Sequence, residues 1–265
     1  MKRIALTLAA LVALSVPAAA DPMDGVAAFD ILPGWRTDRG THMAAVRITL
    51  APGWKTYWRA PGDAGIPPQF QWDGSQNIDA AQFHWPIPEL MNQNGMRSIG
   101  YHGDVIIPIE LSVRDAGEPV RMRGAVQIGV CEQICVPMLF EFDAILPASG
   151  SRDVAIITAL ADRPQTQAEA GVGNVTCAIS PTEDGLQITT RVPTSRAADA
   201  VVIEAGNDAV WVSEPSMNRA GGIIVSRAEM IHMDGGAFAL DRSAVRITLL
   251  SQGSAVDIRG CVAGS

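Results

Sequence analysis

The chain has 265 residues, of which 48% are hydrophobic, and a formal net charge of −8 at pH 7. This length suits one large domain or two ordinary domains. An acidic balance is a poor match for nucleic acid or anionic membrane surfaces, so we expect neither as a partner.

The first 20 residues have the pattern of a secretory signal peptide. Lys2 and Arg3 form a basic start, residues 4–16 are apolar, and the small residues 18–20 precede Asp21. The apolar stretch is too short to span a bilayer, and no later stretch reaches about 18 apolar residues. We therefore expect an exported, soluble protein in the periplasm. Loss of the two basic residues would change the formal charge from −8 to −10.

Residues 21–148 predict a β-sandwich, because short apolar stretches alternate with turns and no long amphipathic helix interrupts them. Pro108 indicates that its strand lies near a sheet edge or a bulge. Segment 89–100 contains Asn92, Asn94 and Gly95 and is expected to be a long loop. The strands expected in this part are 46–50, 69–72, 105–113, 121–130 and 139–146.

Most of the aromatic residues belong to the same part of the chain. We expect them to form the core of the sandwich rather than a binding platform. The residues in question are Trp54, Tyr57, Trp58, Trp72 and Trp85.

A change of composition follows at residue 149. Segment 149–173 is expected to be a linker, with a short helix over 153–163. Residues 174–265 are again strand-like and predict a second, smaller β-domain. The expected strands there are 185–192, 200–205, 209–212, 222–227 and 245–250.

Four cysteines in an oxidising compartment normally form two disulfides. We favour Cys131–Cys135 and Cys177–Cys261, since each bridge then stays within one expected domain. In the chain-entropy model a loop of about 85 residues stabilises the fold by ~4.5 kcal/mol, but a five-residue loop by only ~2 kcal/mol. The bridge between Cys177 and Cys261 is therefore expected to be structural.

Cys131 and Cys135 lie between β-forming flanks, which predicts a hairpin with both cysteines at its tip. Such a bridge could simply staple the hairpin. Its small contribution to stability favours a different interpretation, in which it is an exposed, reversible disulfide that exchanges with partner thiols. The neighbouring carboxylate of Glu132 disfavours a thiolate, so the pair is not expected to be a strong oxidant. The two cysteines cannot be ranked as attacked and leaving sulfurs.

The sulfurs also need protection from stray thiols. The segment Glu89, Leu90, Met91 to Met96 is a candidate cap over the cysteines, although a plain surface loop explains it equally well. These residues make the protein a candidate thiol-disulfide oxidoreductase of the protein-disulfide reductase type, without a cofactor.

The main alternative is a non-catalytic binding module for copper handling or assembly, whose cysteines are structural or ligate the metal. Ten methionines together with Cys131 and Cys135 could offer soft ligands to Cu(I), but no methionine cluster supports such a site. The four histidines are scattered without ligand spacing, and no phosphate loop or hydrolase motif is present. We therefore expect no bound metal.

The first half resembles the N-terminal periplasmic domain of the DsbD family of thiol:disulfide interchange proteins, including its ScsB relatives. The resemblance rests on the stretches 52–59, 61–63, 65–68, 99–101 and 129–137, the last of which reads Gly-Val-Cys-Glu-Gln-Ile-Cys-Val-Pro. It implies an immunoglobulin-like sandwich whose cysteine pair relays reducing equivalents from a membrane electron transporter to periplasmic thioredoxin-fold proteins. It also implies the cap over 89–96 and suggests roles in cytochrome c assembly or copper tolerance.

The chain departs from the family pattern in two respects. Well-studied members have a longer gap between the cysteines and aromatic cap residues, where this chain has Leu90 and Met91. The family also usually continues into a membrane domain and a thioredoxin-like domain, so we expect a separately encoded transporter as the electron source.

Overall fold

A computed structural model describes residues 25–93 and 95–264, so the expected signal peptide over residues 1–20 lies outside the described part. The fold is almost entirely β, which confirms the predicted class. The first unit comprises β1 (Ala27–Arg36), β2 (His42–Leu50), β3 (Lys55–Tyr57), β4 (Gln69–Gln71), β5 (Ala80–Phe83), β6 (Glu89–Gln93), β7 (Met96–His102), β8 (Val105–Ser112), β9 (Val120–Cys131) and β10 (Cys135–Leu146).

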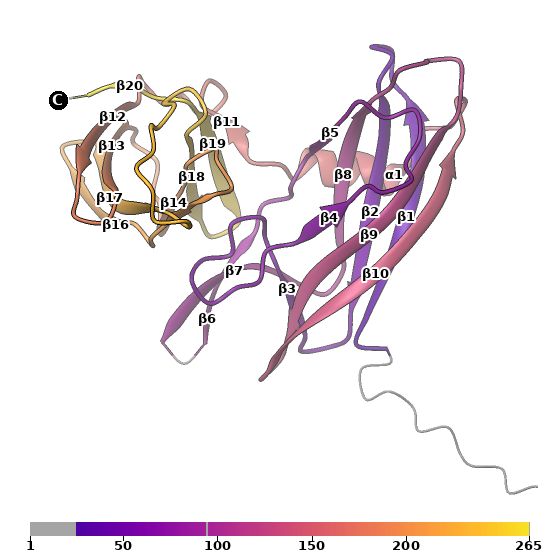
Figure 1. Cartoon of the computed structure of the whole chain (residues 1–265), viewed down its shortest axis with the longest axis horizontal. Helices are drawn as coiled ribbons and strands as arrows, with labels where there is room; N and C mark the ends of the chain where they lie inside the picture. Colours follow the sequence, from indigo (N-terminus) through magenta and orange to yellow (C-terminus); the bar gives the residue numbers. More distant parts are fainter. Residues whose placement is uncertain (1–24, 94, 265) are drawn as a thin grey trace, which may run out of the picture.

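Two sheets form an immunoglobulin-like sandwich in this first unit (Figure 1). One sheet has the strand order β1-β2-β8-β5, and the other has the order β10-β9-β3-β7-β6, with β4 also paired to β9. The long β9 shows why the sandwich closes, since Val126, Ile128 and Val130 alternate toward the core and are all buried. Trp58 and Trp85 join this core, and Trp54 and Trp72 pack against it, as the aromatic pattern indicates.

The segment 89–100 is a β-hairpin, and the prediction of a long loop was wrong. Strands β6 and β7 pair from Glu89 opposite Gly100 to Gln93 opposite Met96, which leaves a two-residue connection. Asn-Gly at positions 94 and 95 is the strongest short hairpin signal, and Gly95 has a φ of 82°. Apolar and polar residues alternate only weakly around that dipeptide, so the polar, asparagine- and glycine-containing composition of the segment favours a loop.

Pro108 lies where β8 comes to the edge of its sheet, in agreement with the sequence prediction, because β2 pairs with β8 over residues 105–111 whereas β5 pairs with it only over residues 109–112. The Pro108 carbonyl accepts a hydrogen bond from the His84 N–H on the β5 side. In a strand the N and O of one residue point to the same side, so the missing N–H also faces β5. The β5 ladder ends one residue away, at Phe83 opposite Ile109, so no ladder bond is lost.

The expected linker, 149–173, contains regular structure in two places. Helix α1 (Val154–Ala161) begins at Asp153, whose side chain accepts hydrogen bonds from two backbone N–H groups of the first turn. Ile156 buries against Met43 and Ala45, which places α1 on the outer face of the first sheet. With eight residues, α1 is far too short to cross a bilayer, and no longer helix occurs in the described chain.

The second unit begins with β11 (Gln165–Thr166), which pairs with β19. One of its sheets has the order β11-β19-β18-β14, and the other has β15-β17-β13-β12-β20 with β16 also on β17. The domain limits proposed from the sequence, 148 and 174, stay a prediction. The further strands of the second unit are β12 (Thr176–Pro181), β13 (Leu186–Pro193), β14 (Ala200–Glu204), β15 (Val210–Val212), β16 (Ser216–Ala220), β17 (Ile223–His232), β18 (Arg246–Ser251), β19 (Ser254–Arg259) and β20 (Val262–Ala263).

The two units contact each other through apolar and charged groups. Ala200, Leu250 and Ala255 of the second unit belong to the same buried cluster as the core of the sandwich. Arg59 of the first unit donates two hydrogen bonds to the Glu204 carboxylate, at 3.1 and 2.9 Å, and one to Thr248 at 3.2 Å.

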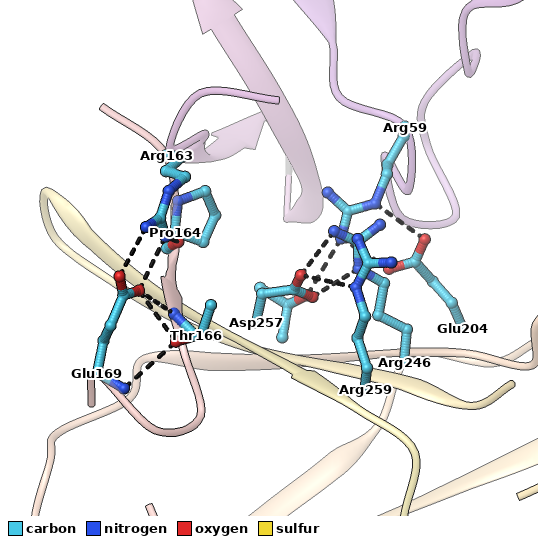
Figure 2. Close-up of polar contacts among 10 residues, drawn as sticks. Arg59, Arg163, Pro164, Thr166, Glu169, Glu204, Arg246, Asp257 and Arg259 are labelled. Atoms are coloured by element: carbon cyan, nitrogen blue, oxygen red, sulfur yellow. Dashed lines mark hydrogen bonds and ion pairs between the residues drawn. The ribbon is translucent and has the colours of Figure 1, made fainter. Parts of the chain in front are cut away.

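Figure 2 shows Arg59 beside the ion pair of Arg246 and Asp257, with Arg259 on the same carboxylate. The Arg59 guanidinium also stacks on the Trp58 ring, 3.7 Å from its centre. The view further shows Arg163 bound to Glu169 near the start of the second unit. Because the Arg59 and Asp257 side chains are largely buried, this cluster fixes one arrangement of the two units.

The disulfide of the second unit joins Cys177, which is fully buried, to Cys261 over a sequence separation of 84. We expect the double variant Cys177→Ser/Cys261→Ser to lower the free energy of unfolding by about 4 kcal/mol, because the unfolded chain is no longer constrained. Denaturant titration without reductant measures this loss. The matched variant Cys131→Ser/Cys135→Ser should lose about 2 kcal/mol at most. An equal loss in the two variants would contradict this division of roles.

Candidate functional site

Cys131 and Cys135 close the tip of the β9–β10 hairpin. They are the last residue of β9 and the first residue of β10, they lie opposite each other in the register, and they form a disulfide. Their accessibility differs strongly, because Cys131 is 0% exposed whereas Cys135 is exposed and follows Ile134, which is 75% exposed. The prediction that both cysteines are exposed is therefore correct for Cys135 and wrong for Cys131.

Tyr57 contacts both sulfurs. Its hydroxyl lies 2.8 Å from the Cys131 Sγ and 3.1 Å from the Cys135 Sγ. Burial raises the pKa of Tyr57, so the phenol keeps its proton at neutral pH and can donate to sulfur. The sequence analysis placed Tyr57 in the sandwich core and missed this role. Tyr57 is indeed buried, but it lies on the same face of the sheet as Cys131, which is paired with Lys55, two residues before Tyr57.

Gly129 makes room for the Tyr57 ring. A Cβ atom at Gly129 would lie 3.0 Å from the ring and 2.6 Å from the Cβ of Ile66. The Tyr57 hydroxyl is also 3.4 Å from the Ala64 carbonyl, so segment 64–66 covers the ring. Tyr57 is thus held between β9 and this segment, with its hydroxyl directed at the disulfide.

The expected cap residues lie on the β6–β7 hairpin. The Glu89 carboxylate accepts a hydrogen bond from Nδ1 of the His102 ring at 2.9 Å, and Met91 is buried against Gly100. Leu90 packs on the sandwich core, whereas Met96 is 58% exposed near the tip. In the sheet order β3 separates this hairpin from β9, and in Figure 1 both hairpins extend toward the lower part of the view. Capping by these residues stays a prediction.

The tip brings two cysteine sulfurs together, but not as part of a larger group of histidine, cysteine and carboxylate ligands among the described residues. Within residues 25–93 and 95–264, no three side chains of His, Cys, Asp or Glu are grouped closely enough to hold a metal ion. The arrangement at the tip is instead suited to sulfur chemistry, with one accessible sulfur, one buried sulfur and a hydrogen-bond donor between them.

Comparison with known proteins gives a family match and two structural matches. Residues 19–147 match the family described as thiol:disulfide interchange protein DsbD, N-terminal. The crystal structure of the N-terminal periplasmic domain of ScsB from Proteus mirabilis aligns with a TM-score of 0.65 and 21% identity, covering 93% of this chain and 97% of that chain. The reduced DsbD N-terminal domain of Neisseria meningitidis aligns with a TM-score of 0.30 and 18% identity, over 49% of this chain and 90% of that chain. No curated protein sequence matches.

The ScsB match covers both units, so the two-unit fold is shared with that structure. This chain spans nearly the whole length of that ScsB domain. At 21% identity the likeness establishes the fold alone.

The position of Tyr57 leads to a prediction for Tyr57→Phe. A hydroxyl donates weakly to a neutral disulfide but strongly to a thiolate, so at a pH at which the reduced pair carries a thiolate its removal should destabilise the reduced form more than the oxidised form. Loss of about 1.4 kcal/mol in the reduced form corresponds to a reduction potential about 30 mV more negative. Equilibration with a dithiol redox buffer measures the potential. A less negative potential in the variant would contradict the proposed donor role.

Proposed function

Because residues 19–147 of this chain belong to the DsbD N-terminal domain family, we propose that the protein carries out thiol–disulfide exchange through Cys131 and Cys135. The observation that supports this best is the pair of unequal sulfurs under one phenol. An accessible sulfur can be attacked, and a buried sulfur with a hydrogen-bond donor can leave as a stabilised thiolate.

The exchange proceeds in two steps when the partner is a reduced dithiol. A partner thiolate attacks the exposed Cys135 sulfur, the Cys131–Cys135 bond breaks, and its electron pair stays on Cys131 as a thiolate. The second thiolate of the partner then attacks its own sulfur in the mixed disulfide and releases Cys135. The partner is oxidised and the cysteine pair of this chain is reduced. The same steps in reverse pass the electrons to an oxidised acceptor.

The site residues have distinct roles in this scheme. Cys135 is the attacked sulfur and Cys131 the leaving sulfur, an order that the sequence alone left open. The Tyr57 hydroxyl donates to the Cys131 thiolate as it forms, which lowers the basicity of the leaving group. Glu89, Leu90, Met91 and Met96 form a cap that limits access of stray thiols to the tip.

The partners follow from the family and from the exposed tip. We infer that thioredoxin-fold proteins of the periplasm exchange with Cys135, and that a membrane electron transporter supplies the electrons. Their active-site thiols would meet Cys135 beside the exposed apolar side chain of Ile134. Roles in cytochrome c assembly or copper tolerance would depend on which of these partners is present.

Single cysteine variants test the proposed order of attack. Incubated with an oxidised thioredoxin-fold protein after reduction, the mature protein with Cys131→Ser should accumulate a mixed disulfide through Cys135, because no second thiol remains to resolve it. The Cys135→Ser variant should accumulate far less, since Cys131 is buried. Non-reducing gel electrophoresis and mass spectrometry detect the adduct, and both variants should melt within a few degrees of the wild type.

Two outcomes would overturn the proposal. One is a reduction potential of the wild-type pair well below about −300 mV, which marks a structural bridge. The other is tight Cu(I) binding by the reduced protein in anaerobic titration, lost with both cysteines, together with no exchange. That result would favour the copper-handling alternative.

A further inference from the structure

A row of side chains crosses the outer face of the β10-β9-β3-β7 sheet at the level of the disulfide. In the register Cys135 lies opposite Cys131, Cys131 opposite Lys55, and Lys55 opposite His102. Directly opposed residues of antiparallel strands point to the same face, with Cβ atoms about 5 Å apart. Lys55 is therefore the cross-strand neighbour of the buried cysteine.

Lys55 is an unusual residue for this position. Only 7% of it is exposed, whereas lysine is almost never buried without an electrostatic reason. Burial lowers its pKa, which means that water stabilises its ammonium group less than at an open surface. A negative charge that forms beside such a group is stabilised more than it would be beside a solvated lysine.

Exchange at the tip creates a negative charge next to this lysine. When a thiolate attacks Cys135, the electron pair of the broken bond stays on Cys131, which is fully buried. An isolated anion at a buried site is costly, so the step requires a compensating group. The Tyr57 hydroxyl offers a hydrogen bond at 2.8 Å but no charge.

Three other titratable groups surround the row. The Glu132 carboxylate lies at the same turn, with its Oε1 3.5 Å from the Cβ position of Gly53. His102, on the far side of Lys55, is bound to Glu89 at 2.9 Å. Of the charged groups on β3, β7, β9 and the hairpin tip, Lys55 is the cation placed directly opposite Cys131.

We propose that Lys55 supplies the positive charge that stabilises the Cys131 thiolate formed when Cys135 is attacked. This inference rests on the proposed exchange function and adds a second group to the leaving-group site. Lys55 and Tyr57 would then act on the same sulfur, one by charge and the other by a hydrogen bond.

The decisive measurement is the pKa of the Cys131 thiol in the full mature chain carrying Cys135→Ser, where Cys131 is the only free thiol. Ultraviolet thiolate absorbance as a function of pH reports it directly. Adding Lys55→Met, which keeps the apolar stem, should raise this pKa by about 1. Lys55→Arg keeps the charge and should leave the pKa near the parent value. If the methionine variant does not fold, Lys55→Gln is measured in its place.

A matched variant of opposite sign is available at the same turn. Glu132→Gln removes a negative charge and should lower the pKa of the Cys131 thiol. With Cys135 present, Lys55→Met should also slow reduction of the disulfide by dithiothreitol about threefold, if leaving-group basicity acts with a coefficient of about 0.5.

An unchanged or lowered pKa in Lys55→Met, or an equal rise in Lys55→Arg and Lys55→Met, would overturn the role of Lys55. The thiol titration needs no protein partner, so it tests Lys55 independently of the exchange function. Wild-type exchange with an unaffected Lys55→Met variant would refute only the inference on Lys55. A wild-type protein that exchanges with no thioredoxin-fold protein would refute the proposed function instead.

Discussion

The short antiparallel pairing of β3 with β9 is the contact on which the geometry of the cysteine site depends. Only two residue pairs make it, Lys55 with Cys131 and Thr56 with Val130. Because successive residues of a strand face opposite sides, this register separates two functions. Thr56 and Val130 face the buried interior, whereas Lys55, Tyr57 and Cys131 face the covered outer side. A slip of one residue would exchange these faces, so core packing of Val130 also fixes the position of the sulfur.

The site also shows how a small disulfide can be both protected and reactive. The Tyr57 hydroxyl contacts both sulfurs, but Lys55 lies opposite the buried one, whereas the exposed one follows the exposed side chain of Ile134. Burial of Cys131 keeps stray thiols away from one end of the bond. The exposed position of Cys135 leaves the other end of the bond open to attack. In the proposed exchange, the sulfur that is attacked is therefore selected by accessibility.

Much of this could be predicted from the sequence. The all-β class, the hairpin around Cys131 and Cys135, and the family of the first half follow from alternation, turn residues and motif stretches that are local in the chain. The hairpin at 89–100 was missed although Asn94-Gly95 signalled it, because few alternating residues accompany that dipeptide. The roles of Tyr57 and Lys55 could not be predicted, since 74 residues separate Tyr57 from Cys131 and only the β3–β9 register brings them together. An aromatic residue in an apolar stretch looks the same whether it faces a core or a sulfur.

The Arg59 cluster has a consequence for the direction from which a partner can arrive. Arg59 follows Tyr57 by two residues and is bound to Glu204, and Arg97 of the β6–β7 hairpin forms an ion pair with Glu214. The second unit is therefore anchored on the β6–β7 side of the redox tip (Figure 1). At the opposite end of the sheet, β10 has no further strand beside it within the described chain. The surroundings of the disulfide are consequently asymmetric. The second unit lies on the β6–β7 side, whereas the β10 side ends in an edge strand. For the exchange proposed above, the side of the hairpin tip next to β10 is therefore the side from which a partner protein meets less steric hindrance.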